Sequence, residues 1–145
     1  MSRICLLVCF AASCALATPL CAAQITADRS AGGVVIKIDG DFFTEYLVKS
    51  GCKPILWPII GPTGKAMTRA YPMTQGTDEK KDHIHQRSLW FTHGDVNGIN
   101  FWAEQGVHGS IEHREFVRVE SGTEAVVVTR NDWLAPDGKR VCADE

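Results

Sequence analysis

Long apolar runs are missing from this chain once its first 23 residues are set apart. Those residues begin with Arg3, continue as an apolar run over 4–17 that is too short to span a bilayer comfortably, and end in Cys21-Ala22-Ala23. The pattern predicts a secretory signal peptide cleaved before Gln24, with a lipoprotein signal as the second alternative. Because no later run is long enough for a transmembrane helix, we expect an exported protein, periplasmic or extracellular.

An excess of positive charge is also missing. Arg3 is the only charged residue of the predicted signal, so its removal leaves 14 basic residues against 17 acidic ones, a net charge of −3 with neutral histidines. Proteins that hold nucleic acid through its phosphates usually carry a clear basic surface. We therefore expect no nucleic-acid partner.

Cysteine is scarce in the part that follows the signal. Four of the six cysteines lie before Gln24, which leaves Cys52 and Cys142. In an exported protein these two can form one disulfide, which would close a loop of about 90 residues and add roughly 4 kcal/mol on the chain-entropy model. Two buried free thiols are the alternative interpretation.

A helical hydrophobic period is absent from every stretch of ten residues. Runs of β-branched and aromatic residues alternate instead with turn signals such as Asp39-Gly40, which is typical of antiparallel strands. The predicted strands cover 34–38, 42–48, 55–60, 111–120 and 125–134, and one more begins at Arg140. This pattern predicts a single all-β domain over 24–145, an antiparallel β-sandwich or barrel.

Three details of this prediction bear on the fold. Residues 24–33 are expected to be a lead-in segment and 65–81 a long surface loop. In the strand 111–120, Ile111, Val117 and Val119 are expected to share one face. The chain stops just as its last strand begins, so we expect a C-terminally truncated piece of a larger sandwich, or an exposed edge that allows self-association.

The stretch 82–102 holds the densest set of groups able to bind a ligand or do chemistry. In an extended segment His83 and His85 point to one side, and Arg87 continues that side. His93 follows close to a turn. Three histidine nitrogens, completed by Asp82 or Asp95, could hold zinc, copper or iron, but the spacing matches no standard motif. We therefore assign no metal ligand and keep a metal-dependent enzyme as an alternative.

A sugar-type site is the preferred hypothesis. Histidine acts as general acid or base near neutral pH, arginine and asparagine make forked hydrogen bonds, and tryptophan offers an apolar platform. The candidate catalytic residues are His83, His85 and His93, and the candidate substrate-binding residues are Arg69, Arg87, Trp90, Asp95, Asn97 and Trp102.

Packing is the alternative for several of these residues. The tryptophans can belong to the core, and Asp95 and Asn97 can bond only to their own loop backbone. Glu104 is expected on a solvated face.

The motifs resemble those of a family of secreted bacterial proteins that is labelled "methane oxygenase PmoA-like". They are Lys53-Pro54, Trp57-Pro58, Gly61-Pro62, Gly64, Thr68-Arg69, Tyr71-Pro72-Met73, the runs 82–91 and 93–98, and Phe101-Trp102. The resemblance implies an all-β fold like the galactose-mutarotase-like supersandwiches, a link to polysaccharide degradation, and a chain that is the N-terminal half of longer members. The family more commonly has a second histidine where this chain has Gln86.

Together these observations predict a secreted domain that binds or processes a carbohydrate. An epimerase or a glycoside-processing enzyme is the enzymatic form of this hypothesis. The alternatives are a metal-dependent oxygenase-like enzyme and a non-catalytic structural fragment. The expected ligand is a small molecule or glycan, with no cofactor unless a metal is held by His83, His85 and His93.

Overall fold

The structure is a computed structural model that describes residues 22–76 and 78–145, so the predicted signal peptide lies outside it except for its last two residues. The described residues contain seven strands and no helix. The strands are β1 (Ile25–Arg29), β2 (Gly33–Ile38), β3 (Asp41–Ser50), β4 (Lys53–Leu56), β5 (Ser110–Glu120), β6 (Val126–Leu134) and β7 (Arg140–Asp144).

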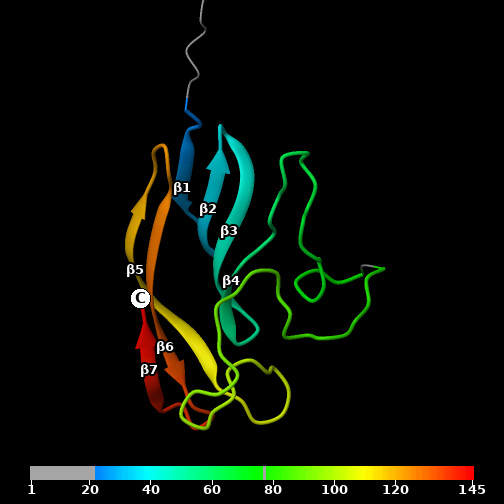
Figure 1. The fold of residues 1–145 in the computed structure, drawn as a ribbon, viewed down its shortest axis with the longest axis vertical. Helices are drawn as coiled ribbons and strands as arrows, with labels where there is room; N and C mark the ends of the chain where they lie inside the picture. The colour runs from blue at the N-terminus through cyan, green and yellow to red at the C-terminus, as the bar shows by residue number, and fades with distance from the viewer. Residues whose placement is uncertain (1–21, 77) are drawn as a thin grey trace, which may run out of the picture.

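The strands form two antiparallel sheets, ordered β1-β2-β3-β4 and β5-β6-β7 (Figure 1). Within each sheet, every strand pairs with its neighbours in sequence. The predicted all-β class is therefore confirmed, and an arrangement of two packed sheets is consistent with a sandwich. No helix in the described ranges is long and apolar enough to cross a membrane.

The β2–β3 hairpin follows directly from its turn residues. Ile38 pairs with Asp41, so the loop is the dipeptide Asp39-Gly40. Both loop residues have positive φ, 51° and 89°. Two successive residues with positive φ make a turn whose twist matches that of the flanking strands, which is why Asp-Gly is a strong hairpin signal.

β1 was not predicted, because residues 24–33 were expected to be a lead-in segment. All five of its residues pair with β2, and Ile25 also forms a bridge with Gly122, two residues after β5 ends. The only apolar residues of β1 are Ile25 and Ala27, which is too short an alternation to predict a strand. The extended conformation of β1 therefore depends on its pairing with neighbouring strands more than on its own hydrophobic pattern.

β4 is shorter than the predicted strand 55–60. It begins at Lys53 and ends at Leu56, just before the cis peptide bond between Trp57 and Pro58. Residues beyond it still follow β3, since the amides of Trp57 and Ile60 donate to Glu45 and Phe43. Proline lacks the N–H that a regular ladder needs, so the chain stays beside β3 without continuing the strand.

The expected common face of Ile111, Val117 and Val119 is wrong for Val117, which is 46% exposed. The pairing of β5 with β6 shifts register twice, between His113 and Glu115 and between Phe116 and Arg118. Each β-bulge inserts an extra residue and so reverses the side on which the following side chains lie.

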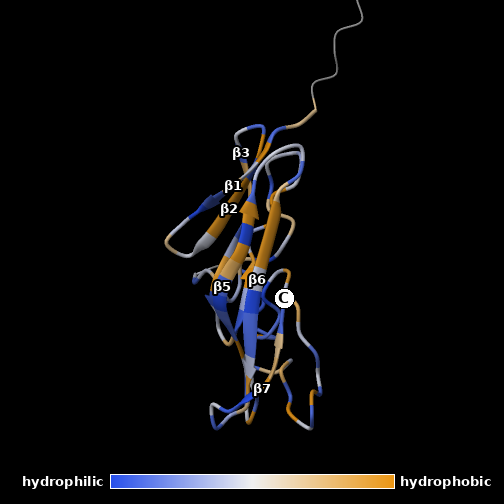
Figure 2. Ribbon diagram, turned by 90° about the vertical axis from the view of Figure 1, so that its left-hand side faces the viewer, coloured by the Kyte–Doolittle hydropathy of each residue, from blue (hydrophilic) through white to orange (hydrophobic). Residues whose placement is uncertain are grey.

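The main core cluster lies on the β5-β6-β7 sheet. Phe101, Ile111 and Trp133 are almost fully buried, and the rings of Phe101 and Trp133 are 4.9 Å apart. Hydropathy changes along β6: its first residues, Val126–Val128, are apolar, and the strand becomes hydrophilic further along (Figure 2).

The two cysteines are free, which contradicts the disulfide hypothesis. The carbonyl of Cys52 accepts from the amide of Ile111, whereas Cys142 pairs with Trp133, and Trp133 in turn pairs with Ile111. Strands lie about 4.8 Å apart, so β6 separates Cys142 from the strand beside Cys52. A disulfide needs Cα atoms within about 7 Å.

Candidate functional site

The candidate site lies on the long segment between β4 and β5, residues 57–109, which contains no named strand (Figure 1). It includes the predicted loop 65–81 but extends much further. An isolated bridge joins Leu56 of β4 to Leu89, and the amides of Trp57 and Ile60 donate to β3, so the segment is tied to the sheet at separate points. A second bridge, between Ile60 and Ala66, lies within the segment.

His83 and His85 lie in a turn and not in an extended strand, so the predicted geometry is wrong. His83 has a positive φ of 45°, and the amide of Gln86 donates to the His83 carbonyl at 2.8 Å. The two imidazoles nevertheless lie together, with ring centroids 5.7 Å apart and planes 89° apart. Their proximity comes from the turn.

Two tryptophans extend this pair into a continuous group. The ring of Trp102 lies 6.0 Å from that of His85 and 5.5 Å from that of Trp90. Trp102 is 43% exposed, whereas the Nε1 of Trp90 is buried and has no hydrogen-bond partner within the described ranges. We call His83, His85, Trp90 and Trp102 the aromatic–histidine cluster.

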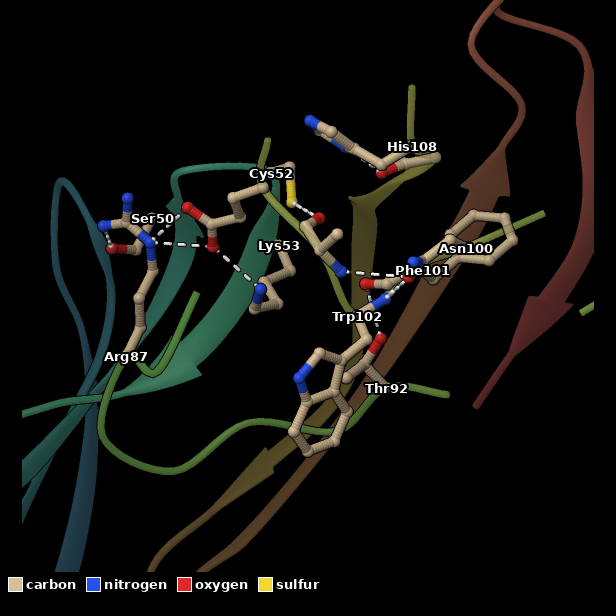
Figure 3. Close-up of polar contacts among 12 residues, drawn as sticks. Ser50, Cys52, Lys53, Arg87, Thr92, Asn100, Phe101, Trp102 and His108 are labelled. Carbon is tan, nitrogen blue, oxygen red and sulfur yellow. Dashed lines mark hydrogen bonds and ion pairs between the residues drawn. The ribbon is translucent and has the colours of Figure 1, made fainter. Parts of the chain in front are cut away.

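The backbone around Trp102 is fixed by its neighbours. The side-chain oxygen of Asn100 accepts from the amides of Trp102 and Ala103 at 2.9 and 3.0 Å (Figure 3). The hydroxyl of Thr92 donates to the carbonyl of the buried Phe101 at 2.8 Å. Trp102 is therefore held next to a core residue while its own ring stays partly exposed.

A group of buried charges lies behind the tryptophans. Glu104 accepts from Lys53 Nζ at 2.7 Å and from Arg87 Nε at 2.8 Å, and Arg87 Nη1 donates to Ser50 Oγ at 3.1 Å (Figure 3). The side chains of Lys53, Arg87 and Glu104 are 0%, 11% and 6% exposed. We call these three residues the ion cluster. It holds two cations and one carboxylate.

The ion cluster and the aromatic–histidine cluster are in contact. Lys53 Nζ lies 5.5 Å from the centroid of the Trp90 ring. Burial lowers the pKa of His85, and the positive charges of Lys53 and His83 lower it further, while Glu104 acts in the opposite direction. The His85 imidazole is therefore neutral near pH 7, when it can both donate and accept a hydrogen bond.

Gly51 makes room for the ion cluster. A Cβ atom at this position would lie 2.5 Å from Glu104 Oε2 and 2.6 Å from Arg87 Nε, and the residue has a φ of 63°. Only glycine satisfies both the space and the backbone conformation. Next to it, burial raises the pKa of the Cys52 thiol.

Arg69 lies at the side of the site. It makes a salt bridge of 3.3 Å to Asp82, donates to the carbonyl of Lys80, and lies 5.2 Å from the Tyr71 ring. Glu79 completes this loop by accepting from the amides of Ala70 and Tyr71, which lowers its pKa. The contacts of Arg69 hold the loop together.

His93, Asp95 and Asn97 lie on a separate exposed hairpin. Val96 and Ile99 exchange both backbone hydrogen bonds around Asn97 and Gly98, whose φ values are 55° and 79°. Asp95 accepts from the amide of Gly98, and His93 Nδ1 bonds with the backbone of Asp95. The contacts of these side chains are with their own loop.

Across residues 22–76 and 78–145, no three or more His, Cys, Asp or Glu side chains form a group that could hold a metal ion. The set His83, His85 and His93 is thus not brought together as ligands. The histidine pair retains its position beside Trp102.

The expectation that Glu104 lies on a solvated face is wrong, and Lys53 was not proposed as a site residue. Both are buried by pairing across 51 positions of sequence. One local signal was available: Lys53 begins the apolar run Pro54–Leu56. A lysine within a buried strand requires a nearby carboxylate, because an unpaired buried charge is very costly.

A groove of about 550 Å³, with Trp90 in its lining, opens between the two sheets. Apolar side chains such as Ile55, Leu89 and Phe91 line it, together with the Tyr46 hydroxyl and the Asp144 carboxylate. Burial raises the pKa of Tyr46, so its hydroxyl stays protonated. Trp90 thus belongs both to the lining of this groove and to the aromatic–histidine cluster, whose two histidines do not line the groove.

The described residues define an all-β protein of two antiparallel sheets, with a polar, aromatic cluster on the connection between them. The chain belongs to the family of unknown function DUF6807, whose model matches residues 33–145. Comparison with curated proteins and with solved structures finds no significant match.

Proposed function

We propose that this protein is an exported domain that binds a carbohydrate at the aromatic–histidine cluster. One observation carries the proposal: the partly exposed Trp102 ring lies beside the His85 imidazole, which is paired with that of His83, and the buried ion cluster contacts the adjoining Trp90 ring through Lys53. A pyranose ring needs a flat apolar surface for one face and polar partners around its edge. Tryptophan and histidine supply these two functions.

Sugar processing, such as epimerisation or glycoside hydrolysis, extends this proposal. His85 has a lowered pKa and is neutral near pH 7, so it can accept a proton, and His83 adjoins it at 5.7 Å. A pair of this kind can move a proton at a hydroxyl or ring carbon. Arg87 would then orient the substrate, since Glu104 and Ser50 hold its guanidinium in place.

Four further properties stay predictions from the sequence. They are export, the label "methane oxygenase PmoA-like", the supersandwich fold, and the correspondence of this chain to the N-terminal half of longer family members. Self-association is another: β7 pairs only with β6 among the described strands, which leaves an edge for a second copy. The metal-dependent alternative requires converging ligands, and the described histidines supply only the pair His83 and His85. We therefore favour the sugar site over the oxygenase and over a non-catalytic fragment.

The test is binding of a glycan array by the wild-type chain and by the double variant His83→Ala/His85→Ala. We expect the double variant to lose binding at least about tenfold, because two hydrogen-bonding groups of roughly 1 kcal/mol each are removed from the site. Its thermal midpoint should change little, since the described contacts of both rings lie at the surface of the segment.

His93→Ala is the matched control, because it removes an imidazole from the same segment whose ring bonds only with its own loop. We expect this variant to bind like the wild type. Undiminished binding by the double variant would contradict the proposal, and equal loss in His93→Ala would place the site elsewhere on the segment.

A further inference from the structure

The charges of the ion cluster do not balance. Lys53 and Arg87 share the single carboxylate of Glu104, so the cluster keeps one positive charge in a region that is almost fully buried. We propose that the carbohydrate bound beside it is anionic, specifically a hexuronate, whose carboxylate interacts with Arg87. This inference rests on the proposed function and narrows its ligand class.

Neighbouring acids do not neutralise the extra charge. Asp82, the acid next to His83 in sequence, already forms a salt bridge with Arg69. The charged groups that act on His85 are Lys53, His83 and Glu104, and those that act on Cys52 are Lys53, Glu104 and Arg87. Lys53 and Glu104 of the ion cluster thus act on both groups, and Arg87 acts on Cys52. A buried charge keeps its field because little water screens it.

Arg87 retains the donors that a carboxylate needs. Its Nε donates to both oxygens of Glu104 and its Nη1 to Ser50, while its Nη2 has no hydrogen bond in the described part of the chain. A guanidinium has five N–H donors, and its planar fork suits a carboxylate. The 11% exposure of the side chain leaves an edge that a ligand can reach.

Lys53 has a different part in the site. Its side chain is fully buried, and its ammonium donates to the same Glu104 carboxylate that accepts from Arg87 (Figure 3). It cannot touch a ligand, but it adds positive potential behind the Trp90 ring, 5.5 Å away. A sugar stacked on Trp102 would therefore find positive potential on the Arg87 side, where its carboxylate would be stabilised.

The test compares oligosaccharides of galacturonate, glucuronate and mannuronate with their carboxyl-reduced, neutral counterparts by isothermal titration calorimetry. Each pair differs only in the carboxylate. We expect at least one uronate to bind about tenfold more tightly than its neutral counterpart, and the preference to shrink as salt rises. Sulfated neutral oligosaccharides form a third arm, which separates carboxylate recognition from attraction of any anion.

Arg87→Gln should reduce the preference for the uronate to near unity while weaker binding of the neutral sugar persists. Lys139→Gln is the matched control: it removes the same formal charge from an exposed turn between β6 and β7, and should keep the wild-type preference. If Arg87→Gln does not fold, the wild-type titrations at low and high salt still decide the question.

The outcomes separate the two proposals. Equal or tighter binding of the neutral sugars would overturn the anionic ligand and leave a carbohydrate site. Preference for sulfated sugars over uronates would overturn the assignment of a carboxylate. Binding of no member of any series would overturn both proposals. A uronate preference that Arg87→Gln abolishes and Lys139→Gln retains would support both.

Discussion

The two sheets and the segment 57–109 are held together by different interactions. Continuous backbone ladders join the strands, and Ile111 and Trp133 of one sheet form a core cluster with Phe101 of the segment. The segment has isolated bridges and scattered backbone hydrogen bonds, and the buried ring of Phe101 and the ion pair of Glu104 with Lys53 anchor it to the sheets. Because the candidate site lies on the segment, its geometry depends on this packing and on a few polar contacts. These contacts can be removed without dismantling a sheet.

The largest expected effects come from removing the main anchor of each region. Trp133→Ala should destabilise the whole domain by about 3–5 kcal/mol, because it removes a buried aromatic ring from the core. Glu104→Gln leaves two cations with no carboxylate and should cost roughly 3 kcal/mol, mainly within the segment.

Hydrogen exchange distinguishes the two variants. In Glu104→Gln, amides of 78–109 should exchange faster while the β2–β3 hairpin stays protected, because that hairpin has its own ladder. In Trp133→Ala, both regions should lose protection. If the β2–β3 hairpin of Glu104→Gln lost as much protection as the segment 78–109, the segment and the sheets would unfold as one unit.

A smaller effect is expected from filling the space beside the ion cluster. Gly51→Ala places a Cβ atom 2.5 Å from Glu104 Oε2, whereas Gly64→Ala meets nothing within 4 Å. Both glycines have positive φ, 63° and 75°, so both variants carry the same backbone penalty of about 1–2 kcal/mol.

Denaturant titration should therefore show a greater loss of stability for Gly51→Ala than for Gly64→Ala, and glycan binding should fall only in Gly51→Ala. Equal losses in the two variants would mean that the ion cluster moves aside at little cost.

The smallest expected effect is a dependence on pH. Burial lowers the pKa of His85 in the segment and of His113 on β5, and the charge of Arg29 contributes at His113. The pKa of each histidine in the folded protein is therefore below its value of about 6.5 in the unfolded chain. At a pH between these two values, the unfolded chain binds more protons than the folded protein. Stability should be full above about pH 6.5 and should fall on acidification through the folded pKa values.

Thermal melts between about pH 7.5 and pH 5 measure this effect. Because His113 lies between Phe116 and Tyr46, His113→Leu should reduce the pH dependence of global unfolding. His85→Gln should change the pH dependence only of exchange in the segment. A melt that becomes more stable on acidification would contradict the lowered pKa values.

Much of the sheet architecture could be predicted from sequence because its signals are local. Asp39-Gly40 requires positive φ at two successive positions, and runs of β-branched and aromatic residues flank it, so the hairpin of β2 and β3 follows from neighbouring residues. β1 and the bulges of β5 were missed for a related reason. Their conformation depends on pairing with β2 and β6, which the residues of β1 and β5 do not show by themselves.

The candidate site was predictable only in part. The adjacency of His83 and His85 was expected, but from an extended strand, and a turn produces it. Lys53 and Glu104 were not assigned to the site, because nothing near either residue shows that the other is its partner.

The amino-acid sequence by itself determined the all-β class, the positions of the main turns and the presence of reactive groups in 82–102. These properties depend on side-chain period and backbone preference within a few residues. Only the tertiary structure decided which of those groups meet. It joined Trp90 and Trp102 to the histidine pair, placed His93 on another hairpin, and buried two cations around Glu104. The physical reason is that packing and charge pairing depend on contacts between residues far apart in sequence.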